Sequence, residues 1–164
     1  MLQKWLILVA LLSACGLANA EIIETNSMKD ALSIVQAGDL VVFDIDNTIL
    51  EPVQSLGSDQ WYSYNVEKFK KDGLSENEAI NKALAMWVEV QYVIQERPVE
   101  TVTPELIKSM QKKGIQVLAL TARPLELKDH TIEALKSVDV ELSAGDLKFP
   151  NPAEEVVFNK GVIL

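Results

Sequence analysis

The chain has little cysteine and a shortage of positive charge. Cys15 is its single cysteine, which excludes an intramolecular disulfide and a thiolate metal site. The formal net charge is -9, because 24 Asp and Glu outnumber 15 Lys and Arg. A surface this acidic repels polyanions, so the composition argues against nucleic-acid binding.

Long apolar runs are missing as well. The run at the N-terminus, Trp5–Leu12, is short for a bilayer, which takes about 20 residues to span. It follows Lys4 and precedes the small-residue pattern Ala18–Ala20. This combination predicts a secretory signal peptide over residues 1–20.

A second cleavage pattern competes with the first. Leu12–Cys15 resembles a bacterial lipobox, in which residues 1–14 are removed and Cys15 carries a lipid. Both patterns predict export, either to the periplasm or the cell exterior or to a lipid anchor at the cell envelope. A lipid on Cys15 is the only membrane attachment that we expect.

The remaining chain has the size and composition of one globular domain, which we place at residues 21–164. Of the 164 residues in the whole chain, 48% are apolar and 24% charged, which is ordinary for a folded protein. Internal repeats and low-complexity segments are absent from the sequence.

Two runs predict strands at the centre of a parallel sheet. Leu40–Ile45 and Ile115–Leu120 are apolar without alternation, as expected for strands buried on both faces. In each case polar residues arrive at the C-terminal end, where open α/β sheets bind ligands. The segment between the strands is much longer than the about 30 residues of a bare strand-helix-strand unit. The surplus, about residues 51–98, predicts a helical insert above this edge of the sheet.

Capping patterns and apolar spacing predict the helices. They are expected after Ser27, from Trp61 to Phe69, from Ser75 to near Arg97–Pro98, after Thr103 and over Glu126–Lys136. Val138–Leu142 is a candidate third strand, and the segment around Asn159–Gly161 predicts a small hairpin.

Asp44 and Asp46 are the residues with the clearest chemistry. Two carboxylates at the end of a buried strand form a hard oxygen site suited to Mg²⁺. Beside a metal, Asp44 is suited to attack a phosphoryl group and Asp46 to protonate the leaving oxygen. The alternative is that both are turn residues that cap the strand.

Two segments resemble motifs of the haloacid dehalogenase (HAD) superfamily. The first motif is matched by Phe43-Asp44-Ile45-Asp46-Asn47-Thr48-Ile49-Leu50, and the second by Leu120–Arg123. The resemblance covers about Leu40–Leu142 and is nearest to the acid-phosphatase-like branch, which includes exported bacterial members of unknown function. It implies an α/β fold, a Rossmann-like three-layer parallel sheet with a helical, cap-like insert.

By position in these motifs, the resemblance implies that Asp44 forms a phosphoaspartate and that Asp46 is the general acid and base. It implies that Thr121 binds the transferring phosphate, and that Mg²⁺ binds the Asp44 carboxylate and the Asp46 carbonyl. The implied substrate is a small phosphorylated molecule. Arg123 has two open interpretations, a substrate contact or a structural ion pair.

The C-terminal part departs from the family pattern. No apolar strand ending in an acidic pair follows Thr121, and Lys160 is the one candidate for the family's lysine. The hairpin prediction makes Lys160 a turn residue instead. We therefore expect a fold that is incomplete at the C-terminus.

Three functions remain at this point. The first is a Mg²⁺-dependent phosphohydrolase acting through a phosphoaspartate, inactivated if the late motifs are lost. The second is a non-catalytic remnant that binds Mg²⁺ and phosphate. The third, a metal-nucleotide site of the glycosyltransferase type, is opposed by the residues that follow Asp46 and by Thr121 on the next strand.

Overall fold

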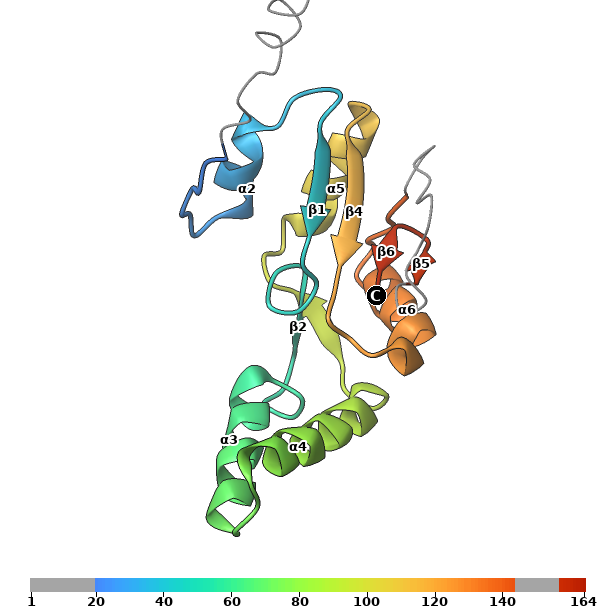
Figure 1. Ribbon diagram of the computed structural model, residues 1–164. Helices are drawn as coiled ribbons and strands as arrows, with labels where there is room; N and C mark the ends of the chain where they lie inside the picture. Colours follow the sequence, from blue (N-terminus) through green and yellow to red (C-terminus); the bar gives the residue numbers. More distant parts are fainter. Residues whose placement is uncertain (1–19, 144–156) are drawn as a thin grey trace, which may run out of the picture.

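A small, mainly parallel sheet forms the centre of the computed structural model, which describes residues 20–143 and 157–164 (Figure 1). Its strand order is β1-β4-β6-β5. The strands are β1 (Leu40–Phe43), β4 (Gln116–Leu120), β6 (Val162–Ile163) and β5 (Phe158–Asn159). β4 is parallel to both β1 and β6, and β5 is antiparallel to β6. The chain is therefore a mixed α/β protein with a parallel sheet, as the sequence predicts.

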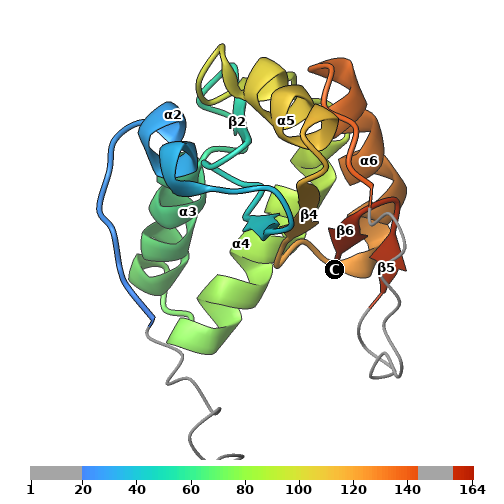
Figure 2. The same ribbon diagram turned by 90° about the horizontal axis from the view of Figure 1, so that it is seen from above.

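Two helices cover one face of this sheet. α5 (Thr103–Lys112) has proline at the start, as predicted, and Gly114 follows its end with φ 77°. A short 3₁₀ helix, η2 (Leu125–Leu127), leads into α6 (Lys128–Ser137). Apolar residues of both helices join the core with Phe43, Val117 and Ala119 of the sheet. Figure 2 shows α5 and α6 on the same side of the strands.

The opposite face of β1 and β4 is partly open. Leu40 and Val42 alternate with the core residues of β1, so they point to the other face. Their side chains are 49% and 47% exposed, and Leu120 on β4 is 52% exposed. Among the described residues, helices of the core cover one face of this sheet rather than both, so the three-layer arrangement stays a prediction.

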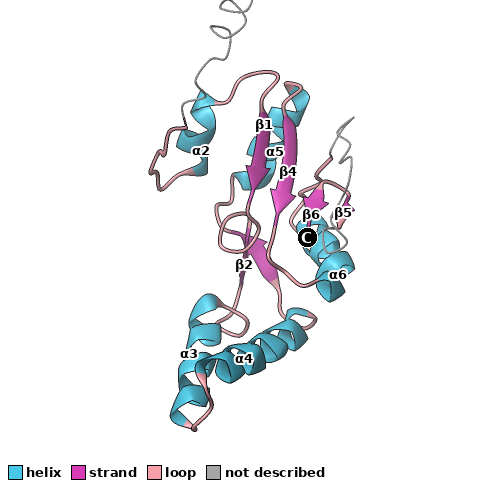
Figure 3. Cartoon of the chain, in the orientation of Figure 1, coloured by secondary structure: helices cyan, strands magenta, loops and turns pink. Residues whose placement is uncertain are grey.

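The insert between β1 and β4 lies beyond the C-terminal ends of these strands, where the sequence predicts it (Figures 1 and 3). It contains α3 (Asp59–Lys71) and α4 (Glu76–Gln91). The predicted capping box at the start of α4 is present, because Ser75 and Glu78 exchange hydrogen bonds. The helices pack through a second apolar cluster around Phe69, Ala79 and Ala83.

The insert is not helical over its whole predicted length. Its two ends form an antiparallel two-stranded sheet of β2 (Leu50–Pro52) and β3 (Glu96–Pro98), in which Pro52 pairs with Glu96. Each strand has three residues, too few for an alternating pattern to be recognised. The prediction that helix extends to about residues 51 and 98 was wrong, because strands occupy both ends of the insert.

Two other local predictions also fail. Val138–Leu142 forms no strand, although Val140 and Leu142 are buried in the core. β6 pairs with β4 in parallel, and Ser143, just after the segment, forms an isolated bridge with Val117. The capping box at Ser27 is missing because its side chain makes no capping bond, and the Met28 N–H donates instead to the Glu100 carboxylate. The resulting helix, α2 (Met28–Ala31), continues as a 3₁₀ turn, η1 (Leu32–Ile34).

The hairpin prediction is confirmed. Lys160 and Gly161 occupy its turn with φ angles of 48° and 83°, between β5 and β6. The two predicted cleavage sites and Cys15 lie outside the described residues. In the part of the chain that the structure describes, no helix has the length and apolar character to cross a membrane.

Candidate phosphate site at the ends of two parallel strands

Asp44 and Thr121 lie at one edge of the sheet, as their positions after two strands predict. The β1–β4 register pairs Phe43 with Ala119, so both strands end within two residues of each other. Asp44 and Thr121 line the same open pocket of about 440 Å³, together with Val42, Leu120 and neighbouring residues. Asp44 is exposed and Thr121 is buried.

The loop after β1 is held by its own backbone. The Ile45 carbonyl accepts hydrogen bonds from the N–H groups of Thr48, Ile49 and Leu50 at 2.9–3.2 Å. Asn47 has a φ of 58°, a left-handed conformation that Asn tolerates better than most residues. Its side-chain amide donates to Asp59, at the start of α3, at 2.8 Å. This bond joins the loop to the insert.

Asp46 forms an ion pair with Arg123, as one of the two interpretations of that arginine predicts. Nε of Arg123 donates to both Asp46 carboxylate oxygens at 3.2 and 3.1 Å, and Nη2 donates to Oδ1 at 2.7 Å. The Arg123 backbone N–H donates to the Thr121 hydroxyl at 3.1 Å. A structural ion pair is therefore present, and it ties the first motif to the second.

Arg123 has a second carboxylate partner that sequence analysis missed. Nη2 also donates to Glu96 of β3 at 2.6 Å. The side chains of Arg123 and Glu96 are 1% and 4% exposed, whereas that of Asp46 is 34% exposed. Burial works to lower the pKa of the Arg123 guanidinium, but the hydrogen bonds and charges of Asp46 and Glu96 raise the pKa above its ordinary value.

The guanidinium also faces the insert. Its Cζ lies 5.8 Å from the centre of the Trp87 ring on α4, within the range of a cation–π interaction. Nη1 is buried and has no hydrogen-bond acceptor among the described residues. The pairing with Glu96 carries no local sequence signal, because the two residues are 27 positions apart on different elements.

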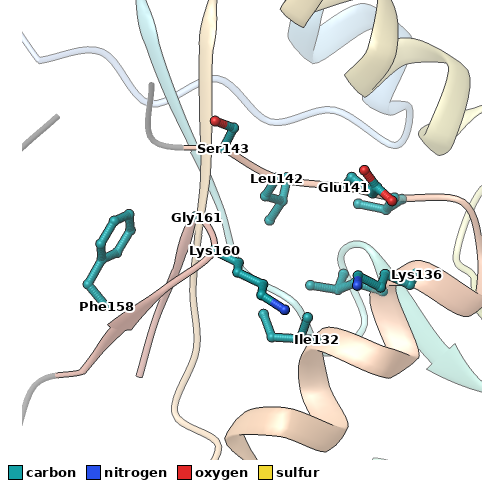
Figure 4. Close-up of a pocket in the computed structure, with 10 residues that line it drawn as sticks. Ile132, Lys136, Glu141, Leu142, Ser143, Phe158, Lys160 and Gly161 are labelled. Atoms are coloured by element: carbon teal, nitrogen blue, oxygen red, sulfur yellow. The ribbon is translucent and has the colours of Figure 1, made fainter. Parts of the chain in front are cut away.

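Lys160 does not join this site. It lines a different pocket, of about 390 Å³, with residues of α6 and of the β5–β6 hairpin. Figure 4 shows its side chain directed toward Ile132 and Lys136. Among the described residues, those that line the Asp44 pocket include no lysine. The hairpin-turn interpretation of Lys160 is thus the one that the geometry fits.

Few side-chain oxygens that could coordinate a metal ion lie near Asp44. Among the described residues, no group donates a hydrogen bond to the exposed Asp44 carboxylate. Nowhere in residues 20–143 and 157–164 do three or more His, Cys, Asp or Glu side chains gather in an arrangement suited to a metal. Proteins commonly bind Mg²⁺ through one or two carboxylates together with substrate phosphate and water. The donor set fits that kind of shared site rather than a closed protein cage.

The architecture defines a mixed α/β protein with ligand-accessible polar groups at the carboxyl ends of parallel strands. Comparison with known proteins then gives the family. Residues 24–164 match the family described as "Protein of unknown function (DUF2608)", and the chain belongs to it. No solved structure matches the chain.

Several relatives come from Chlamydia and carry the name "Putative outer membrane protein". One from Chlamydia trachomatis serovar D is 26% identical over 123 residues, which cover 75% of this chain and 47% of the relative. One from Chlamydia pneumoniae is 26% identical over 173 residues, covering 99% of this chain and 64% of the relative. The chain thus spans about half to two thirds of the length of these relatives.

Proposed function

We propose that the chain carries a HAD-type phosphomonoester site, in which Asp44 is the nucleophile and Thr121 binds the phosphoryl group. The observation that carries the proposal is the shared pocket of Asp44 and Thr121 at the ends of β1 and β4. An exposed carboxylate that accepts no hydrogen bond from the described residues and shares a pocket with a hydroxyl suits attack on a phosphoryl group that the hydroxyl holds.

The local charge makes a divalent cation necessary for phosphate binding. Asp44, Asp46 and Glu96 contribute three carboxylates, and in the described part of the chain Arg123 is the one cation that pairs with any of them, namely with Asp46 and Glu96. A phosphate dianion would be repelled by this surplus of negative charge. Mg²⁺ at the Asp44 carboxylate and the Asp46 carbonyl would supply the missing positive charge and polarise the phosphoryl oxygens.

The reaction would proceed by two displacements at phosphorus. An oxygen of Asp44 bonds to phosphorus while the bond to the ester oxygen breaks, and the leaving alcohol takes a proton from Asp46. Water would then attack phosphorus and give a proton to Asp46, while the bond between phosphorus and the Asp44 oxygen breaks and inorganic phosphate is released. Arg123 occupies both Asp46 oxygens, so it must release one of them before Asp46 transfers a proton.

A second candidate is phosphate and Mg²⁺ binding without hydrolysis. Two observations favour it: the ion pair of Arg123 with Asp46, and the lack of a lysine among the described residues that line the Asp44 pocket. Loss of one electrostatic contact to a transition state lowers turnover by about 100- to 1000-fold. A site without the lysine would therefore retain binding more readily than catalysis.

The test measures hydrolysis of p-nitrophenyl phosphate with and without Mg²⁺. We expect slow, Mg²⁺-dependent turnover that Asp44→Asn abolishes. Asp72→Asn is the matched control, because Asp72 is an exposed aspartate that follows α3, and it should leave turnover unchanged.

Equal inertness of the wild type and Asp44→Asn would contradict the enzymatic proposal. Calorimetry with inorganic phosphate and Mg²⁺ then decides the second candidate, which requires phosphate binding that depends on Mg²⁺ and on Asp44. A thermal-shift comparison of vanadate with sugar nucleotides separates both candidates from a metal-nucleotide site.

We also propose that the protein acts at the cell envelope or outside the cytoplasm. The support is the signal-like sequence of residues 1–20 and the names of the chlamydial relatives. The choice between a free periplasmic or secreted form and a lipid on Cys15 follows from the mass of the mature N-terminal peptide.

A further inference from the structure

We infer that Glu96 is a positioning residue for Asp46 and acts through Arg123, so that the seating of the insert sets the orientation of the Asp46 carboxylate. The consequence of this positioning for catalysis rests on the proposed function. The positioning itself involves only the side chains of Asp46, Arg123 and Glu96 and does not depend on that function.

The inference begins with a single nitrogen shared by two carboxylates. Nη2 of Arg123 donates to Asp46 at 2.7 Å and to Glu96 at 2.6 Å. An Nη group has two hydrogens, so each hydrogen has its own carboxylate and rotation about the Cζ–Nη2 bond would break both bonds. With Nε also bonded to Asp46, the plane of the guanidinium is fixed.

The hydrogen bond from Arg123 to Glu96 is better shielded from water than its bonds to Asp46. The Glu96 side chain is 4% exposed, against 34% for Asp46, so water competes less for its bond to Arg123. Nη1 has no acceptor among the described residues and does not help to hold the group. Without Glu96, Arg123 would keep only Asp46, and the pair would turn together more freely.

Glu96 lies where the chain returns from the helices of the insert to the core. It is the first residue of β3, and Trp87 of α4 lies against the same guanidinium. Asp46 belongs to the loop after β1 and shares Nη2 of Arg123 with Glu96. A displacement of the insert therefore changes the partner of Arg123 first and the carboxylate of Asp46 second.

The test exploits the composition of the chain, which has two arginines, Arg97 and Arg123. In ¹⁵N-arginine-labelled wild-type protein, we expect separate, slowly exchanging Nη signals for Arg123. Arg97 is the internal control, because its side chain is 60% exposed in a surface pair with Glu51, and its Nη signals should average. Averaged Arg123 signals in folded wild-type protein would overturn the inference.

A pair of variants tests the effect on Asp46. Glu96→Gln keeps the size of the side chain but removes its charge, and we expect loss of the separate Arg123 signals and a shift of the Asp46 carboxyl ¹³C resonance. Glu51→Gln removes the other ion pair of the β2–β3 sheet and should change neither. A folded Glu96→Gln variant with an unmoved Asp46 resonance would contradict the positioning role.

These readouts are independent of turnover. If the arginine signals behave as expected while p-nitrophenyl phosphate is not hydrolysed, the positioning arrangement stands and the proposed chemistry fails. If the Glu96→Gln variant does not fold, the wild-type arginine spectrum decides the inference alone.

Discussion

Arg123 and Arg97 illustrate how far the contribution of an ion pair depends on its surroundings. Arg123 is buried between Asp46 and Glu96, whereas Arg97 pairs with Glu51 on the surface. Removing one member of a buried pair leaves a desolvated charge behind, while a surface charge is simply rehydrated.

We expect Arg123→Met to lower the free energy of unfolding by about 3–5 kcal/mol, because the Glu96 carboxylate loses its partner in a buried place. Arg97→Met should lower it by about 0.2–1 kcal/mol at most. Urea denaturation of the two variants and the wild type measures the difference. Similar losses in both variants would show that burial does not strengthen the Arg123 pair.

Single residues were predictable from sequence where their role follows from position along a strand. Asp44 and Thr121 were placed correctly at one edge of the sheet, because parallel neighbours bring their carboxyl ends together. Glu96 and Trp87 were not, because their contact with Arg123 depends on how the insert folds back over the loop. Periodicity and capping carry no information about such a contact.

At the scale of elements, the successful predictions have a local cause and the failures do not. The capping box at Ser75, the glycine after α5 and the turn at Lys160 each depend on a few adjacent residues. Val138–Leu142 was a candidate third strand, yet it forms no strand, and β6 pairs with β4. Val140 and Leu142 are buried in the core without a strand, because long-range packing rather than local pattern decides this segment.

Gly161 in the β5–β6 turn lies close to Leu142 and Ser143, and comparison with Gly114 gives a paired test of two glycines. A Cβ on Gly161 would lie 2.7 Å from the Leu142 Cβ and 2.8 Å from backbone atoms of Leu142 and Ser143. A Cβ on Gly114 would meet nothing within 4 Å, although both glycines have positive φ angles. The two positions therefore separate backbone strain from crowding.

We expect Gly114→Ala to destabilise the protein by about 1–2 kcal/mol, the cost of a left-handed alanine. Gly161→Ala should cost about 1–3 kcal/mol more, because the extra methyl overlaps atoms that cannot move aside easily. Thermal unfolding of both variants provides the measurement. Equal destabilisation would mean that the hairpin shifts away from Leu142 without resistance.

At the scale of the whole molecule, the sheet has an exposed edge. Among the described strands, β1 pairs only with β4, and Leu40, Val42 and Leu120 leave apolar surface beside that edge. An unprotected apolar edge strand is a template for pairing with another chain. The net charge of -9 opposes association but does not cover this surface.

We predict concentration-dependent self-association that Val42→Lys weakens at least about tenfold, since an unpaired lysine buried at a contact costs more than about 1.4 kcal/mol. Val93→Lys places the same charge on an equally apolar but separate site, 71% exposed after α4, and should have little effect. Sedimentation velocity over a concentration series measures both. A wild type that stays monomeric, or equal effects of the two lysines, would contradict this role of the edge.

The small β2–β3 sheet gives the molecule a modular organisation. Since Pro52 pairs with Glu96, the chain leaves the core and returns to it at neighbouring points, and both helices of the insert lie on one excursion. Such an excursion can be lengthened, shortened or exchanged during evolution without altering the pairing of β1 with β4. Diversity among relatives should accordingly concentrate between these two points, while the acidic residue at the return point stays constant as long as its arginine does.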